Sequence, residues 1–162
     1  VLEAAKEPFH HIHGAGKAGY PKVLSALREK GVDPAAHPAL QVREYIYDMP
    51  LVMAAADVVL CRAGASTISE LTAIAKPSVL VPSPNVTANH QEKNARVLAD
   101  QGAAILLREQ DCGEHTLYDT VELLMQERDR RDAMVRALNA MAVPNAGEKI
   151  YQTLREIMRD KA

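Results

Sequence analysis

Residues 62–70, which read Arg-Ala-Gly-Ala-Ser-Thr-Ile-Ser-Glu, carry the residue types of a site for an anion and a sugar. They follow a short apolar run that is typical of a strand buried in a parallel sheet, and they lead into a helix. Gly64 lets a ligand approach the backbone, and the N–H groups at the start of the helix can face an anion. Ser66 and Glu70 share a helix face, where the carboxylate can accept two hydrogen bonds from a vicinal diol such as a ribose.

The same segment has a purely structural interpretation. Thr67 and Glu70 have the spacing of a capping box, in which the carboxylate only satisfies a backbone N–H at the start of the helix. The local sequence supports both interpretations equally.

Two further loops carry polar or aromatic residues at the ends of predicted strands. His90, Gln91 and Asn94 lie at the start of a helix, and uncharged amides there suit sugar hydroxyls, which need both donors and acceptors. An ordinary polar helix start is the structural alternative. Tyr45 and Ile46 end another strand, where a ring and free main-chain groups could hold a flat base, although core packing explains the same residues.

Two other patterns lack the partners that their chemistry needs. Residues 14–19 match the glycine pattern of dinucleotide-binding loops, but the acid expected about 20 residues later falls at Asp33 in a Pro-rich loop. A tight turn between a strand and a helix is therefore favoured. His11 and His13 share one strand face, but no Cys or acid joins them at metal-ligand spacing, so no metal site is predicted.

Short apolar runs alternate with amphipathic stretches along the chain, and this pattern predicts an α/β fold with a Rossmann-like parallel sheet and flanking helices. In such sheets, ligands bind beyond the carboxyl ends of the strands, where the loops named above lie. The expected strands are 9–13, 40–46, 58–61, 78–81 and 103–107. The expected helices are 21–30, a short one from 48, 66–75, 89–101, 114–127, 130–141 and 146–160.

The composition narrows the class of protein. The chain has 162 residues, of which 48% are hydrophobic, and its net charge of −2 gives no basic excess for binding nucleic acid. Two distant cysteines suit a reducing compartment, and no apolar run reaches the ~20 residues of a membrane span. The chain begins without Met, and residues 1–6 read like the middle of a helix, so we expect a piece of a longer protein.

Three segments, read together, carry a family resemblance. Residues 45–50 read Tyr-Ile-Tyr-Asp-Met-Pro, residues 56–70 contain Cys-Arg-Ala-Gly-Ala with Thr and Glu behind it, and residues 89–95 read Asn-His-Gln-Glu-Lys-Asn-Ala. In this order and spacing they resemble the MurG family of peptidoglycan glycosyltransferases. The resemblance implies that residues 1–162 are the C-terminal, donor-binding half of a GT-B fold. It also implies that the first strand with its phosphate loop and the N-terminal acceptor domain are missing.

The resemblance assigns roles to residues of the donor site. Ile46 would offer its main chain to the uracil of UDP-GlcNAc, Glu70 would bind the ribose, and Gln91 would contact hydroxyls of GlcNAc. N–H groups at the start of the helix would line the diphosphate. The full set is Tyr45, Ile46, Arg62, Gly64, Ala65, Ser66, Thr67, Glu70, His90, Gln91 and Asn94.

The implied reaction is an inverting transfer of GlcNAc from UDP-GlcNAc to lipid I, which is undecaprenyl-diphospho-MurNAc-pentapeptide, to form lipid II. The resemblance implies no metal or other cofactor. It places the enzyme peripherally on the cytoplasmic face of the bacterial plasma membrane, and the catalytic groups and the lipid I contacts in the missing N-terminal half. The chain alone is therefore expected to bind the donor without turnover. The alternatives are another UDP-sugar transferase of this architecture, such as a glycolipid synthase, a dinucleotide-binding domain, or a non-catalytic partner module.

Overall fold

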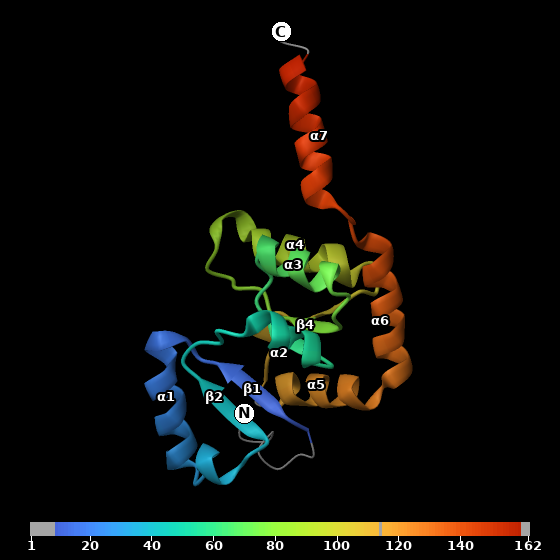
Figure 1. The fold of residues 1–162 in the computed structure, drawn as a ribbon. Helices are drawn as coiled ribbons and strands as arrows, with labels where there is room; N and C mark the ends of the chain where they lie inside the picture. The colour runs from blue at the N-terminus through green and yellow to red at the C-terminus, as the bar shows by residue number, and fades with distance from the viewer. Residues whose placement is uncertain (1–8, 114, 160–162) are drawn as a thin grey trace. The chain divides into compact units, whose positions relative to one another are not determined.

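The computed structural model describes residues 9–113 and 115–159 of the chain (Figure 1). The helical start suggested for residues 1–6 lies outside the described residues, as do residues 114 and 160 at the ends of two predicted helices. Backbone contacts divide the chain into two compact units, Val1–Ala55 and Ala56–Ala162. Each unit has its own parallel strands and its own buried side chains.

The first unit is built around two parallel strands. Its elements are β1 (His11–Gly14), α1 (Gly16–Glu29), η2 (Pro34–Ala36), β2 (Leu40–Arg43) and α2 (Met49–Ala55). In the register of the pair, His11 lies opposite Leu40 and Gly14 opposite Arg43. Leu27 from α1 and Leu40 from β2 are buried. The predicted order of elements is therefore confirmed in this unit.

Gly14 and Gly16 form a tight turn, as predicted for this glycine pattern, whereas Gly19 lies inside α1. Gly14 ends β1, only Ala15 follows it, and Gly16 begins α1 with a positive φ of 70° that favours glycine. Helix α1 thus begins five residues before the predicted start, and Pro21 lies inside it. The start predicted at Pro21 is therefore wrong: proline is favoured in the first turn of a helix, but here a full turn precedes it.

The second unit contains a three-stranded parallel sheet in the order β3-β4-β5. Its residues Val79, Leu124 and Met134 form a buried cluster, with partly buried Val58 and Ile105 against it. Its elements are β3 (Val59–Cys61), α3 (Ala65–Ala73), β4 (Ser78–Leu80), η3 (Thr87–Asn89), α4 (His90–Ala99), β5 (Ile105–Leu106), η4 (Glu109–Asp111), α5 (Thr116–Gln126), α6 (Arg128–Met141) and α7 (Ala146–Arg159).

The two apolar strands β3 and β4 differ in burial. All three residues of β4 are buried, as the sequence predicts, and β4 pairs with β3 on one side and β5 on the other. The prediction that residues 58–61 are buried on both faces is wrong for Leu60, which is 44% exposed. Within the described part of the chain β3 pairs only with β4, and an edge position of this kind leaves one flank less covered.

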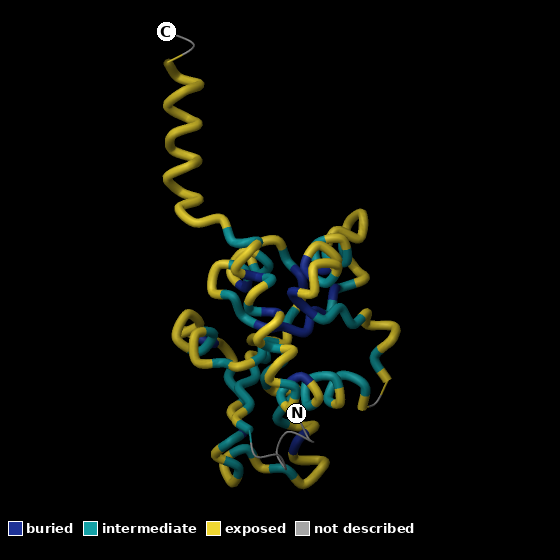
Figure 2. The backbone as a smooth tube through the Cα atoms, turned by 90° about the vertical axis from the view of Figure 1, so that its right-hand side faces the viewer, coloured by how far each residue is buried: buried dark blue, intermediate teal, exposed yellow. Residues whose placement is uncertain are grey.

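The three C-terminal helices follow the sheet. Arg131 in α6 donates hydrogen bonds from Nη1 to the main-chain oxygens of Leu124 and Met125 near the end of α5, so it fixes the corner between these helices. Helix α7 is exposed along its length (Figure 2). Among the helices of the described residues, none combines the length and the hydrophobicity that a membrane span requires.

Candidate functional site

The turn between β3 and α3 leaves main-chain donors free. Gly64 is the residue before the helix and adopts an extended conformation, with φ −67° and ψ 151°. The first hydrogen bond of the helix is donated by the N–H of Ile68 to the oxygen of Gly64, at 3.0 Å. The N–H groups of Ala65, Ser66 and Thr67 therefore have no main-chain acceptor in the helix, and the helix dipole makes this end attractive to an anion.

The capping-box interpretation of Glu70 is wrong. Helix α3 begins at Ala65, so Thr67 lies inside the first turn and is not the capping residue; the capping position is Gly64, which has no side chain to form a cap. Glu70 lies one turn further on and is exposed. Its carboxylate has no hydrogen-bond or ion-pair partner among residues 9–113 and 115–159. Glu70 is therefore available to a ligand, and exposed Ser66 lies one turn before it.

Cys61, the last residue of β3, is not a nucleophile at neutral pH. Burial raises the pKa of its thiol to about 11, and the negative charge of Glu70 adds to the effect. A thiol with such a pKa stays protonated and unreactive. The chemistry of this turn therefore belongs to its main-chain N–H groups and to the polar side chains around it.

Arg62 connects this turn to the ends of the other two strands. Its Nη1 donates hydrogen bonds to the main-chain oxygens of Val81 at 3.2 Å and Pro82 at 3.4 Å, just after β4. The same nitrogen lies 2.6 Å from Oε2 of Glu109 in η4, just after β5. Sequence reasoning missed Glu109 because it lies 47 residues from Arg62, beyond the reach of any local motif.

The two amides at the start of α4 hold the neighbouring loops. Asn94 Nδ2 donates a hydrogen bond to the oxygen of Ala63 at 3.1 Å, and Gln91 Oε1 accepts one from the N–H of Ser83 at 2.9 Å. Both side chains are half-buried. Asn94 Oδ1 and Gln91 Nε2 have no partner within the described ranges. Each amide therefore has a structural role and keeps one polar atom for a ligand.

His90 lies beside these amides at the first position of α4 and is exposed. Its Nδ1 lies 2.8 Å from the main-chain oxygen of Thr87, so the ring closes the short turn of η3. The structure thus brings Arg62, the turn at Gly64 and the start of α4 to the carboxyl ends of the strands of the second unit.

Tyr45 and Ile46 belong to the first unit. The side chain of Ile46 is 9% exposed, and its Cδ1 would lie 3.2 Å from a Cβ added to Gly14, so core packing explains it. The main-chain groups of Ile46 take part in no backbone hydrogen bond between described residues. Tyr45 is 65% exposed, and its ring meets that of Tyr47 edge-on at 4.9 Å, so Tyr45 is not a core residue.

The two histidines of β1 lie apart from each other and are partly buried. The rings of His11 and His13 lie 6.0 Å apart, and burial lowers the pKa of His11 to about 4. No group of three or more His, Cys, Asp or Glu residues within the described part of the chain is arranged to hold a metal ion.

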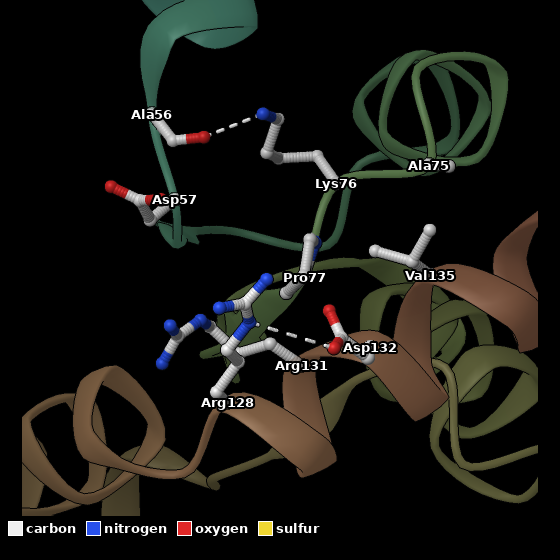
Figure 3. A pocket seen from close by; sticks show the side chains of 9 residues that line it. All are labelled: Ala56, Asp57, Ala75, Lys76, Pro77, Arg128, Arg131, Asp132 and Val135. Atoms are coloured by element: carbon white, nitrogen blue, oxygen red, sulfur yellow. Dashed lines mark hydrogen bonds and ion pairs between the residues drawn. The ribbon is translucent and has the colours of Figure 1, made fainter.

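A separate pocket of about 460 Å³ lies at the amino ends of β3 and β4, whereas the turn at Gly64 follows the carboxyl end of β3. Figure 3 shows the side chains that line this pocket. Its cations are engaged with the protein: Lys76 Nζ donates to the oxygen of Ala56 at 2.5 Å, and Arg128 pairs with Asp132 at 3.8 Å. None of the residues predicted for the site lines it. The lining residues are Ala56, Asp57, Ala75, Lys76, Pro77, Arg128, Arg131, Asp132 and Val135.

Comparisons with known proteins agree with this architecture. A solved structure described as MurG of Acinetobacter baumannii has a TM-score of 0.75 and 30% sequence identity, and the match covers 90% of this chain and 42% of that one. This confirms the predicted fold, a parallel α/β fold of the kind found in the C-terminal half of GT-B glycosyltransferases.

Two curated relatives carry one name, UDP-N-acetylglucosamine–N-acetylmuramyl-(pentapeptide) pyrophosphoryl-undecaprenol N-acetylglucosamine transferase. The protein of Acetivibrio thermocellus is 41% identical over 154 residues, which is 95% of this chain and 40% of that protein. The protein of Bacillus licheniformis is 39% identical over 155 residues, 96% of this chain and 41% of that protein.

The chain spans about two fifths of the length of these relatives. The sequence pattern of the glycosyltransferase family 28 C-terminal domain matches residues 1–150. The predicted resemblance is confirmed, and the chain belongs to glycosyltransferase family 28, of which it contains the C-terminal domain.

Proposed function

We propose that residues 1–162 form the donor-binding domain of an inverting transferase that moves GlcNAc from UDP-GlcNAc to lipid I and so makes lipid II for peptidoglycan. The names of the relatives supply the reaction, and one observation in the structure carries the assignment of the donor site. At the turn after β3, the N–H groups at the start of α3 and the carboxylate of Glu70 lie on the same element, and neither has a partner among the residues that the structure describes.

The donor would bind along this turn. The N–H groups of residues 65–67 take the diphosphate, because they form the positive end of a helix with no capping side chain. Glu70 accepts two hydrogen bonds from the ribose diol. Gln91 Nε2 and Asn94 Oδ1 serve the hydroxyls of GlcNAc, since their other polar atoms already hold the loops, and His90 supports the start of α4.

The family resemblance assigns the uracil base to Ile46 and Tyr45. The main-chain groups of Ile46 are free to pair with the edge of uracil, and the exposed ring of Tyr45 offers a surface beside it. This assignment is supported by the family resemblance of residues 45–50 and by the unpaired main chain of Ile46.

The proposed reaction is a direct displacement at the anomeric carbon of GlcNAc by the 4-hydroxyl of the acceptor. Negative charge grows on the departing UDP, and the N–H groups at the start of α3 together with Arg62 stabilise it. These groups supply the charge compensation that a metal ion gives in other transferases, so we propose a metal-independent reaction. The base that activates the acceptor hydroxyl is assigned to a part of the longer enzyme outside this chain.

The acceptor and the location follow from the same proposal. Lipid I is a membrane lipid, and the family resemblance implies that the enzyme works peripherally at the cytoplasmic face of the bacterial plasma membrane, with lipid I bound mainly by its N-terminal domain. The net charge of −2 favours no nucleic-acid partner.

Competition binding tests the donor specificity. The chain is titrated with UDP-GlcNAc, UDP-glucose, UDP-galactose and NADH, and UDP-GlcNAc is expected to bind most tightly. Preference for UDP-galactose or UDP-glucose would favour a glycolipid synthase, and binding of NADH without UDP would favour a dinucleotide domain. With a lipid I analogue present, the chain alone is expected to bind the donor without transfer. Transfer by the chain alone would contradict the placement of the base outside it.

A further inference from the structure

Arg62 is held through one of its nitrogens only. Nη1 makes all three contacts, with the main-chain oxygens of Val81 and Pro82 and with the carboxylate of Glu109. Nε and Nη2 have no partner in the parts of the chain that the structure describes. The side chain is 54% exposed. The guanidinium therefore keeps an unoccupied edge of the kind that binds phosphate through two parallel hydrogen bonds.

Glu109 provides the shortest of the three contacts. Its Oε2 lies 2.6 Å from Nη1, whereas the main-chain oxygens lie at 3.2 and 3.4 Å, and a hydrogen bond between two charged groups is the stronger kind. Arg62 is the only partner of the Glu109 carboxylate within the described ranges. Without Glu109, only the two longer contacts to main-chain oxygens would hold this exposed arginine. Its side chain would then sample more rotamers, and a ligand would have to order it on binding.

The position of Arg62 in the fold links its restraint by Glu109 to anion binding. Arg62 lies two residues before Gly64, in the turn whose N–H groups are free at the start of α3. We propose that Glu109 is a positioning residue: it fixes Nη1 of Arg62 so that the edge formed by Nε and Nη2 stays ordered for a diphosphate group. The identity of the ligand as a nucleoside diphosphate rests on the function proposed above, whereas the ordering of Arg62 by Glu109 does not.

A surface ion pair without any role in binding is the alternative, since exposed pairs contribute little to stability. The two interpretations predict opposite changes in anion affinity when Glu109 is removed. By Coulomb's law, removing a carboxylate near an anion site strengthens anion binding. Loss of a positioning group weakens it, because the arginine must then be ordered at the cost of binding free energy.

Three variants separate these effects. Glu109→Ala removes both the charge and the hydrogen-bond acceptor, and Glu109→Gln removes the charge but keeps an acceptor oxygen. Asp111→Asn is the matched control, because Asp111 lies in the same turn η4 and pairs with Arg108 at 3.7 Å, not with Arg62. The affinity of the chain for UDP, uridine and inorganic pyrophosphate is measured by calorimetry, and the Nε–H signal of Arg62 is followed by NMR.

Positioning predicts that Glu109→Ala weakens the binding of UDP and pyrophosphate by about threefold to tenfold. Uridine, which has no phosphate, is expected to bind unchanged, and Glu109→Gln is expected to lie closer to the wild type. The Nε–H signal of Arg62 should be sharp in the wild type and lose its dispersion in Glu109→Ala. Equal or tighter UDP binding by Glu109→Ala, matching Asp111→Asn, would overturn the proposal, and so would a parallel loss of uridine binding.

The outcomes also distinguish this proposal from the proposed function. If pyrophosphate binds and Glu109→Ala weakens it while UDP-GlcNAc does not bind, the positioning role stands and the proposed function fails. If UDP binds equally to the wild type and to Glu109→Ala, the positioning role fails and the proposed function stands. Binding of neither UDP nor pyrophosphate to the wild type would overturn both.

Discussion

Replacing Asn94 by Ala tests whether this amide holds the turn that carries the candidate site. Asn94 Nδ2 donates to the oxygen of Ala63 at 3.1 Å, and Ala63 is completely buried. The variant leaves that oxygen without its hydrogen bond, which costs the desolvation of a buried acceptor. Because Asn94 is only half-buried and water can reach part of the gap, we expect the free energy of unfolding to fall by about 1–2 kcal/mol. Urea unfolding followed by circular dichroism measures the difference.

Two comparisons make this measurement decisive. Asn94→Asp is expected to be less stable than Asn94→Ala, because it places a carboxylate against a main-chain oxygen with no donor between them. Lys93→Ala is the control, since Lys93 is exposed on the same helix, and we expect a change within about 0.5 kcal/mol. If Asn94→Ala were as stable as Lys93→Ala, the hydrogen bond to Ala63 would not hold the turn, and the amide would be free for the sugar alone.

Two further perturbations, acidification and the substitution of Arg131, are expected to lower the free energy of unfolding. Acidification from pH 7.5 to 4 should destabilise the wild type more than His11→Gln, because burial lowers the folded pKa of His11 to about 4 and the unfolded chain takes up protons first. At about 1.4 kcal/mol per pKa unit, the loss of unfolding free energy due to His11 is at most about 3 kcal/mol. Solvent screening of the half-buried ring reduces this loss to about 1–2 kcal/mol. Parallel pH profiles of the free energy of unfolding would contradict this origin. In thermal unfolding, Arg131→Ala should cost about 2–3 kcal/mol, since its hydrogen bonds to the oxygens of Leu124 and Met125 are charge-assisted. Arg128→Ala, whose exposed ion pair is 3.8 Å long, should cost less than about 0.5 kcal/mol, and equal losses would refute the role of Arg131 at the corner.

The elements could be predicted because their signals are local. Alternating apolar runs indicated the strands, and the apolar run at residues 79–81 indicated the buried strand β4. The start of α1 was missed because Pro21 is compatible with a first turn, yet it lies well inside the helix. The exposure of Leu60 was missed because a strand's place at the sheet edge depends on its neighbours and not on its own sequence.

The candidate site, like the fold, was only partly predictable from the sequence. The turn at Gly64 was predictable because the residue types of residues 62–70 specify a strand, a turn and a helix start in sequence. The choice between a capping role and a free carboxylate for Glu70 depended on the first residue of the helix. The sequence predicts the start of a helix only to within a few residues. The restraint of Arg62 by Glu109 joins segments 47 residues apart, so only the folded chain reveals it.

The central claim is that the turn after β3 binds the donor nucleotide sugar through the free carboxylate of Glu70. Calorimetric titration with UDP-GlcNAc tests it most directly, with Glu70→Ala as the test variant and Asp100→Ala as an exposed acidic control. We predict binding by the wild type and by Asp100→Ala. For Glu70→Ala we predict an affinity about tenfold to a hundredfold weaker, from the loss of hydrogen bonds to a charged acceptor, with unchanged stability. No binding by the wild type, or equal binding by Glu70→Ala, would contradict the claim.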